Sequence, residues 1–592
     1  MTHAHAGNSQ PAPLIDIAII GGGVSGAYTA YRLMKSDPAA NPVLKRLLQL
    51  SGKERLDIGL FELSNRIGGR LWSYHLPGMT SLPAELGGQG FAKYMQNVFG
   101  LATQELGLEL AASSSYNKRY FQYLRGHRFN YKDNLLSGPR KRKFYPSVIP
   151  YFLRNDEKEK DLDELVEEAS LAGIPEQTKQ IIADIAEALK QGDLGEAFKK
   201  RKQELIPLLR NARVNDSGPA FSQRPLYELG FWNVLEARLS SEAYQLISDS
   251  SYDYSDFRNF NFYDSIVNNL DADFCFALNP EPFVQLKNGY QELPKMLVKH
   301  FRNEGGSVHL QTSLRRLRLE YHNGEPLIAL DIGPTGIPLD STVYARYVVL
   351  ALPQRALKLL DPASVIFQNP RFKTEMNTVT PALAGKIFLA YDQPWWESLE
   401  YGPGKVPNEQ ITCGFSITDL PIRVCYYLGK QEDGKSLLLA SLNDDVISPF
   451  WDGFLHASRL GVHDAPYGGN FNGGQNLFAP EDMVSAVQRQ LAQMHGLKPG
   501  KIPEPYAAIY HYWGDDPFGG GWHDWNPHVR SWEVIPSIRQ PIPGINIFLC
   551  GEAYSASQGW VEGALNTAEM VLETYFGLPR PDWVDPEYDF GP

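Results

Sequence analysis

The sequence predicts an α/β protein (α+β by its parts), in which a parallel sheet covered by helices is combined with a second, mixed sheet and a helical insertion. Three observations predict this class. A β-branched strand, a glycine-rich turn and a helix follow one another over Asp16–Met34. Glu, Lys, Ala and Leu dominate Glu157–Leu209, and strand-like runs separated by Gly, Pro and Asn fill residues 378–510.

The first unit has the sequence of a nucleotide-binding turn. The apolar run Asp16–Ile20 indicates a buried parallel strand, and it leads into Gly21-Gly22-Gly23-Val24-Ser25-Gly26, which fits G-x-G-x-x-G. The pattern needs a tight turn, a close backbone approach to a pyrophosphate, and a helix whose N–H groups face the anion. A second strand, Leu56–Phe61, and an acid follow in order, so we expect a Rossmann-type dinucleotide site. Its candidate binding residues are Gly21, Gly23, Val24, Ser25, Gly26, Glu62 and Leu63.

The acid, Glu62, lies further from the glycines than the usual spacing of about 20 residues. Between them, Ser36–Pro42 ends the first helix and Val43–Leu50 predicts a short added helix. We interpret these residues as a surface insertion, which open α/β units tolerate well.

The next residues indicate which dinucleotide binds. The run Leu63-Ser64-Asn65-Arg66-Ile67-Gly68-Gly69-Arg70 resembles the flavin amine oxidase family, whose pattern after the ribose acid is x-x-x-R-x-G-G-R. The resemblance extends from about residue 15 to 577 and implies FAD rather than a nicotinamide, with Gly69 and Arg70 near the diphosphate or the flavin.

The resemblance also implies a domain organisation. The FAD-binding domain is expected to comprise residues 14–99, 280–353 and 535–578, and the substrate-binding domain residues 100–154 and 354–534. A helical domain is expected over residues 155–279, and residues 1–13 form a polar arm that we expect to be disordered. The Gly- and Asn-rich residues 453–480 are expected to be a mobile loop.

Later segments resemble parts of the family that contact FAD. Adjacent glycines leave backbone free to lie against a flat ligand, and the family places this turn, here Gly87 and Gly88, against the flavin ring. In the return to the FAD domain, Val308 matches a valine whose backbone contacts adenine.

The last such segment is a strand, a Gly-Glu turn and a helix that begins with Gly-Trp. Helix N–H groups there would favour negative charge on the N1/O2 edge of a reduced flavin. The resemblance implies that Glu552 bonds a ribityl hydroxyl and that Trp560 walls the substrate cavity, the alternative being an aromatic ring that fills the core. The cysteine that some amine oxidases link to the flavin here is absent, so we expect non-covalent FAD. The further candidate contacts are Gln89, Gly90, Gly551, Gly559, Val561 and Ala564.

Three candidate catalytic residues are Lys386, Tyr427 and Trp560. Lys386 sits in the apolar run Gly385–Tyr391, where an ammonium needs partners because burying a charge is costly. It matches the family lysine that holds a water over flavin N5; the alternative is a lysine that reaches the surface. His523 and His528 are guesses for a general base, and the sequence offers no dedicated one.

The segment Thr418–Tyr427 resembles, almost residue for residue, a segment of L-amino-acid oxidases in which one of two paired tyrosines hydrogen-bonds the substrate carboxylate. Alternation along a strand lets only one of them point into the cavity, and we choose Tyr427. The candidate substrate contacts are therefore Gly90, Tyr426, Tyr427, Gly559 and Trp560.

The chain departs from those oxidases at the Gly-Gly turn. There the turn continues Met-Arg, and the arginine grips the carboxylate in a bidentate pair; here the residues are Gln89 and Gly90. A charge-assisted bond of about 1.5–3 kcal/mol is lost. The glycine is expected to open volume beside the flavin, and a glutamine in this turn is seen in oxidases of simple amines.

Composition excludes several other classes. The 592 residues are 43% apolar and 21% charged, as in soluble globular proteins, and the net charge of −12 argues against nucleic acid as a partner. No run approaches 18 apolar residues, so no membrane span is expected, and the polar N-terminus is unlike a secretory signal. Four cysteines without C-x-x-C spacing (Cys275, Cys413, Cys425 and Cys550) indicate reduced thiols in a cytoplasmic protein, with no bound metal expected.

The resemblance implies oxidation of the amino group of an L-amino acid to an imine, with O2 reduced to hydrogen peroxide. Three alternatives stay open: an oxidase of a carboxylate-free amine or polyamine, a flavin monooxygenase that converts an amino acid to an amide, and a non-catalytic flavoprotein. The substrates are small molecules, and a homodimer is left open.

Overall fold

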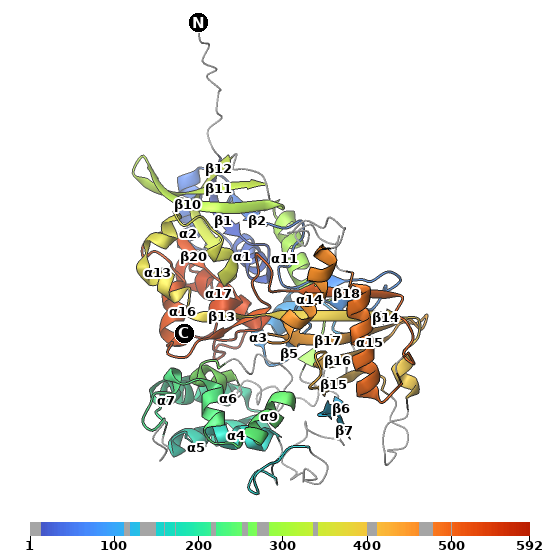
Figure 1. Cartoon of the computed structure of the whole chain (residues 1–592). Coiled ribbons are helices and arrows are strands. Elements are labelled where there is room, and N and C mark those ends of the chain that lie inside the picture. The colour runs from blue at the N-terminus through green and yellow to red at the C-terminus, as the bar shows by residue number, and fades with distance from the viewer. Residues whose placement is uncertain are drawn as a thin grey trace.

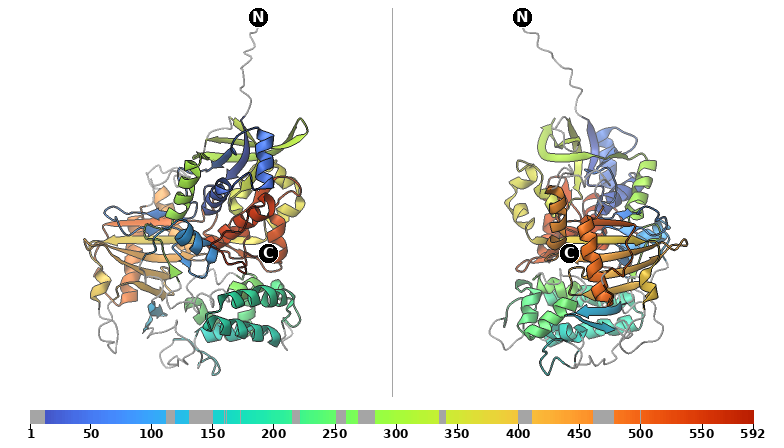
Figure 2. Two further views of the ribbon diagram at one scale, coloured as in Figure 1. Left: turned by 180° about the vertical axis from the view of Figure 1, so that it is seen from behind. Right: turned by 45° about the vertical axis from the view of Figure 1, so that its right-hand side comes forward.

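The computed structural model describes residues 13–111, 119–130, 150–158, 160, 162–171, 173–214, 221–250, 259–268, 283–334, 341–399, 411–460, 478–498 and 500–592. The first sheet lies at the top, the second sheet lies lower and to its right, and a group of helices lies at the bottom (Figure 1). Two further views show the same three-part arrangement (Figure 2).

The first sheet is built around the strand that precedes the glycine-rich turn, β1 (Leu14–Ile20). This strand pairs in parallel with β12 on one side and β2 on the other, as the sequence predicts. Beyond them, β9 extends one edge in parallel, β10 and β11 form an antiparallel edge, and β20 pairs in parallel with the end of β12. The bounds are β2 (Ile58–Phe61), β9 (Ser307–His309), β10 (Thr312–His322), β11 (Glu325–Pro334), β12 (Ser341–Leu350) and β20 (Ile547–Leu549).

Helices cover both faces of this sheet because successive side chains of β1 point to opposite sides. Ile17 and Ile19 pack in one core with α1, α11 and α17. Ala18 and Ile20 pack in another with α12, α13 and α16. The bounds are α1 (Val24–Lys35), α11 (Glu292–Asn303), α12 (Gln354–Lys358), α13 (Pro370–Glu375), α16 (Ser531–Ile538) and α17 (Val561–Val571).

The added helix after α1 is confirmed as α2 (Pro42–Ser51). Asn41 caps its first turn by accepting hydrogen bonds from the N–H groups of Val43 and Leu44, and Gly52 ends it in the left-handed conformation. The insertion is thus a separately capped element on the nucleotide-binding unit.

The second sheet is mixed, with the strand order β18-β14-β17-β16-β15-β6-β7. One face packs against the segment around β3 and β4, and the other face packs against α15. We call these the inner and the outer face. The bounds are β3 (Ser73–Tyr74), β4 (Ala84–Glu85), β6 (Arg119–Leu124), β7 (His127–Asn130), β14 (Ala384–Tyr391), β15 (Gly414–Thr418), β16 (Val424–Lys430), β17 (Ser436–Asp444), β18 (Ala507–Tyr512) and α15 (Glu481–His495).

Shorter elements join the two sheets. β5 pairs with β8, and β13 pairs with β19. The expected mobile loop is wrong in its first part, because α14 extends into it; residues 461–477 lie outside the described residues. The bounds are α3 (Gln96–Gly100), β5 (Phe91–Ala92), β8 (Phe283–Val284), β13 (Val379–Ala382), α14 (Ser448–Leu460) and β19 (Trp522–Trp525).

The helical part has a core of its own. Three side chains from the C-terminal tail, Val584, Tyr588 and Phe590, complete that core, and no sequence pattern indicated this. Among the described helices, none is long and apolar enough to cross a membrane. The bounds are α4 (Leu162–Leu171), α5 (Glu176–Lys190), α6 (Leu194–Lys200), α7 (Ile206–Asn211), α8 (Phe231–Glu236) and α9 (Ser241–Ser250).

Candidate active site

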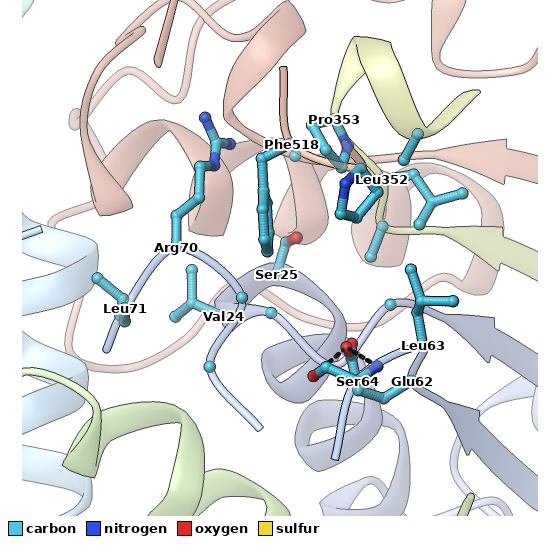
Figure 3. Close-up of a pocket in the computed structure, with 18 of the residues that line it drawn as sticks. Val24, Ser25, Glu62, Leu63, Ser64, Arg70, Leu71, Leu352, Pro353 and Phe518 are labelled. Carbon is cyan, nitrogen blue, oxygen red and sulfur yellow. Dashed lines mark hydrogen bonds between the residues drawn. The ribbon is translucent and has the colours of Figure 1, made fainter. Parts of the chain in front are cut away.

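A cavity of about 460 Å³ lies where the carboxyl ends of β1, β2 and β12 meet, the usual position of a ligand on an open parallel sheet. It continues past the turn after β20 to the end of β18 in the second sheet, which contributes His511 and Tyr512. Figure 3 shows Val24 and Ser25 on one side of the cavity, and Arg70, Phe518 and the Leu352–Pro353 segment on the other.

Two glycine-rich loops form the floor of this cavity. The N–H of Gly68 donates to the carbonyl of Gly22 at 2.9 Å, which ties the loop after β2 to the turn after β1. A Cβ on Gly26 would lie 1.9 Å from the carbonyl oxygen of Gly21, so only glycine lets α1 approach the strand this closely. Gly26 therefore acts through packing, and Gly21, Gly23 and Gly69 line the cavity itself.

Two helices begin at the cavity with their first N–H groups unshielded. Gly23 and Trp560 are the N-cap residues of α1 and α17, and neither cap provides a side-chain acceptor. Four backbone N–H groups at a helix start lack partners within the helix, and they favour a bound anion. Both helices contribute lining residues, namely Val24 and Ser25 from α1, and Val561 and Ala564 from α17.

Glu62 follows β2 and is held firmly. One carboxylate oxygen accepts from the N–H of Gly22 at 2.6 Å, and the other accepts from the N–H and hydroxyl of Ser64 at 2.8 and 2.7 Å (Figure 3). The carboxylate thereby links the glycine-rich turn to the end of β2, and Glu62 and Leu63 both line the cavity.

A buried charged cluster forms the opposite end. The Glu552 carboxylate accepts from the N–H groups of His523 and Gly559, both at 2.9 Å, and it pairs with Arg70 at 2.9 Å. The Nδ1 atom of His523 lies 3.0 Å from the same carboxylate. Burial alone would raise the pKa of Glu552, but Arg70 and then His523 outweigh it and lower this pKa to about 2. The turn after β20 is therefore fixed around an anion, with Arg70 also donating to the carbonyl of Gly521 at 2.8 Å.

Lys386 lies on the inner face of β14, buried beneath the Gly87–Gly88 turn. Its Nζ donates to the carbonyls of Glu85 at 3.0 Å and Gly87 at 2.5 Å. A Cβ on Gly87 would lie 1.8 Å from the carbonyl oxygen of Arg70, and Gly88 lines the cavity. Lys386 thus positions the turn that sequence analysis placed against the flavin, and the alternative of a lysine that reaches the surface is excluded.

The choice of Tyr427 as a substrate contact is wrong. Its side chain points to the outer face of the second sheet, where its hydroxyl lies 2.8 Å from Nε2 of His495 and donates to Ser416 at 3.2 Å. Tyr426 points to the inner face and packs against Phe415, with ring centroids 5.2 Å apart.

The expectation that Gly90 opens volume beside a ligand is also wrong. A Cβ there would lie 2.4 Å from the carbonyl oxygen of Val284, because β5 begins next to Gly90 and pairs with β8. The amide of Gln285 donates to the carbonyl of Gln89 at 3.1 Å. Both residues are therefore packed against this pair of strands, outside the cavity lining.

Val308 lies in β9, paired with Leu60 of β2, and not at the cavity. The wall there is formed slightly later in the chain by Thr312, Ser313, Leu314 and Arg315. Of the two histidines suggested as a general base, His523 supports Glu552. His528 is exposed on a loop, where its backbone N–H donates to the carbonyl of Tyr227.

The parts of the cavity wall that the sequence did not indicate include Phe518 and His511. Strand alternation from Trp513 backwards would have placed His511 on the same face as its cross-strand partner Lys386. Phe518 comes from a loop, and no periodic signal marks it. Within the described ranges, no cluster of acidic, His and Cys side chains could hold a metal ion.

Comparison with known proteins agrees with this geometry. Residues 45–571 match the model of the flavin-containing amine oxidoreductases. The chain belongs to this family. It is 28% identical to aplysianin-A of Aplysia kurodai over 95% of this chain and 90% of that protein. It is 25% identical to achacin of Lissachatina fulica over 95% of this chain and 93% of that protein.

Two further comparisons are more distant. L-amino-acid oxidase 4 of Hebeloma cylindrosporum is 22% identical over 50% of this chain and 44% of its own length. A solved structure of putrescine oxidase bound to putrescine superposes with a TM-score of 0.55 at 17% identity, covering 95% of this chain and 98% of that one. The latter likeness shows the fold, which is that of the flavin amine oxidases.

The residues present in this oxidoreductase fit its cofactor, FAD. The two helix starts suit the diphosphate, the glycine loops leave room for backbone contact, and Glu62 stands at the ribose end. Cys550, directly before the Gly-Glu turn, is buried, and burial raises its pKa to about 12. A protonated thiol is a poor nucleophile, which is consistent with the expectation of non-covalent FAD.

Proposed function

We propose that this flavin-dependent oxidoreductase oxidises the amino group of an L-amino acid to an imine, which water hydrolyses to a 2-oxo acid and ammonia, while O2 is reduced to H2O2. FAD, when bound, would supply the acceptor for the hydride that leaves the α-carbon and the route of both electrons to O2. The protein's own residues bind, orient and shield the reactants.

The observation that carries the proposal is the orientation of Tyr426. The segment Thr418–Tyr427 resembles one in L-amino-acid oxidases, and its inner-face tyrosine belongs to the same core layer as Trp72, which lines the cavity. A phenol hydroxyl can donate to a carboxylate. The half-length similarity to a fungal L-amino-acid oxidase adds independent support.

The surrounding residues provide an aromatic wall for a substrate. Trp560 lines the cavity at the start of α17, and its ring stacks on Phe283 with centroids 6.0 Å apart. A fixed positive charge at Lys386 would stabilise negative charge that develops on oxygen near the Gly87–Gly88 turn. We assign no general base, because an amine that enters unprotonated in a desolvated site needs none.

A second candidate, an oxidase of carboxylate-free amines, is favoured by one observation. Gly90, where the L-amino-acid oxidases carry their carboxylate-binding arginine, has no space for a Cβ. An arginine cannot be accommodated there without moving β8. A substrate without a carboxylate would not require that arginine.

Peroxide release decides between these functions. We would feed the holoenzyme the twenty common L-amino acids and, for each, the amine left by decarboxylation. The proposal expects each reactive acid to exceed its amine in kcat/KM by at least about tenfold, which corresponds to roughly 1.4 kcal/mol. Equal reaction of amines, esters or amides would instead establish the second candidate. Formation of an amide product in place of peroxide would indicate a monooxygenase, and no reaction with any amine would indicate a non-catalytic flavoprotein.

A further inference from the structure

The cavity wall contains a histidine that no part of the proposed function uses. His511 lies on β18, between Ile509 and Trp513, which both belong to the core of the inner face. Tyr510, one residue earlier, packs with the outer face. Strand alternation therefore directs the His511 ring inward, and the residue lines the cavity.

The position of His511 relative to Lys386 is fixed by the sheet. The two residues are direct partners in the antiparallel pairing of β14 with β18, so both side chains lie on the inner face. Lys386 holds the Gly87–Gly88 turn, and Gly88 is part of the same cavity wall. His511 consequently stands beside the region of the turn that faces the cofactor.

The imidazole is buried without satisfying its polar atoms. Its edge contacts are aromatic, with ring centroids 5.2 Å from Trp72 and 4.3 Å from Trp513. Neither ring nitrogen has a hydrogen-bond partner among the described residues. A neutral imidazole has one N–H donor and one acceptor lone pair, and buried polar groups are normally paired. An unpaired ring at a cavity wall therefore indicates a partner that the protein itself does not provide.

The ring is held in its neutral form. Burial, and then the neighbouring cations Arg66 and Lys386, lower the pKa of His511 to about 3. The side chain is thus a neutral donor and acceptor throughout the neutral range, beside the side chain of Lys386.

We propose that His511 is a cofactor-positioning residue, whose neutral imidazole hydrogen-bonds the polar edge of the bound flavin ring beside Lys386. The pyrimidine edge of a flavin carries alternating nitrogen and oxygen acceptors and an N–H donor, whereas its dimethylbenzene edge carries none. The proposal therefore orients the polar edge of the ring toward the wall formed by β14 and β18. It is independent of which amine is oxidised.

The test compares His511→Leu and His511→Gln with Tyr510→Phe, a matched control on the same strand that faces the other way. Apoprotein is prepared from each by acid release of FAD. We then measure the FAD dissociation constant by flavin fluorescence, the visible spectrum of the reconstituted protein, and the melting temperature with and without FAD.

His511→Leu is expected to weaken FAD binding by about three- to tenfold, the range of one neutral hydrogen bond, and to shift the flavin absorption bands. The apoprotein should melt no lower than the wild type, because the substitution removes an unpaired buried polar group. His511→Gln should recover most of the affinity, and Tyr510→Phe should retain the wild-type affinity and spectrum.

Three results would overturn the proposal. Wild-type FAD affinity and a wild-type flavin spectrum in His511→Leu would show that the His511 ring contacts only water and not the cofactor. An equal loss of melting temperature with and without FAD would show a purely structural histidine. A His511→Gln protein that binds FAD as weakly as His511→Leu would exclude a hydrogen-bonding role.

Discussion

The carboxylate of Glu552 is the most strongly supported ion in the site, and its removal is the sharpest test of how the site is built. Glu552→Gln keeps the shape of the side chain but removes its charge. The substitution leaves Arg70 without its carboxylate at 2.9 Å and places an amide where the carboxylate accepts from Gly559 and His523. A buried cation that loses its partner typically costs about 3–5 kcal/mol.

The pKa of Glu552 gives a second measure of the free energy of unfolding that this carboxylate contributes. It falls from 4.5 to about 2 in the folded protein, and a difference of this size corresponds to roughly 3 kcal/mol of stability. Because the folded pKa is depressed, this contribution is fully present above pH 4.5, the unfolded value, and it is lost as the pH falls toward 2.

Urea unfolding of the apoprotein at a series of pH values measures the effect without the influence of bound FAD. Glu552→Gln should be less stable than the wild type by about 3 kcal/mol at pH 7, and the difference should disappear as the pH approaches 2. Glu533→Gln is the matched control, because Glu533 is paired with Arg530 on the surface and exposed surface pairs contribute little. A Glu552→Gln protein whose stability differs from the wild type by the same amount at both ends of the pH range would refute the reasoning.

Four further outcomes are expected. Lys386→Met should slow the reaction of reduced flavin with oxygen more than it slows flavin reduction, because a positive charge stabilises superoxide-like character. Rapid mixing measures the rates of both half-reactions. Equal, small effects on the two rates would restrict Lys386 to holding the Gly87 carbonyl. Tyr426→Phe should reduce the preference for amino acids over amines in kcat/KM. Tyr427→Phe should leave that ratio unchanged but cost about 1–3 kcal/mol in urea unfolding, because it removes the partner of Nε2 of the buried His495. Gly90→Ala should destabilise the fold by about 1–3 kcal/mol, because its Cβ meets the Val284 carbonyl, and an unchanged unfolding midpoint would contradict that contact. Acid precipitation should release FAD into solution, and colour that stays with the protein would reveal a covalent link.

Local spacing was sufficient to predict the nucleotide-binding half of the site. The turn after β1, the acid after β2 and the start of α17 are each set by a few consecutive residues. Turn geometry and helix starts are local properties, so short motifs determine them. The added helix α2 was predictable for the same reason, since its capping Asn41 and terminal Gly52 stand in the sequence next to it.

The substrate half depends on contacts between distant segments, and sequence patterns predicted it less well. In β16 the residues Val424–Tyr427 are all buried, because helices cover one face of the sheet and the FAD-binding part covers the other. No polar and apolar alternation then indicates which tyrosine points inward. The restriction at Gly90 likewise comes from Val284, far away in the chain, which no local pattern reveals.

These contacts also limit how a carboxylate can be recognised. Three arginines line the cavity, and each is already engaged: Arg70 by Glu552, Arg66 by the carbonyls of Gly69 and Leu71, and Arg315 by the hydroxyl of Ser313. They hold the loops that form the FAD site. Selection of an acid over its amine would then depend on neutral donors such as Tyr426, each worth about 0.5–1.5 kcal/mol, rather than on a charge-assisted pair of about 1.5–3 kcal/mol. An oxidase built in this way should prefer an amino acid over its amine by about tenfold rather than by the larger factor that a charge-assisted pair would add, and the position of one glycine against β8 is the structural cause.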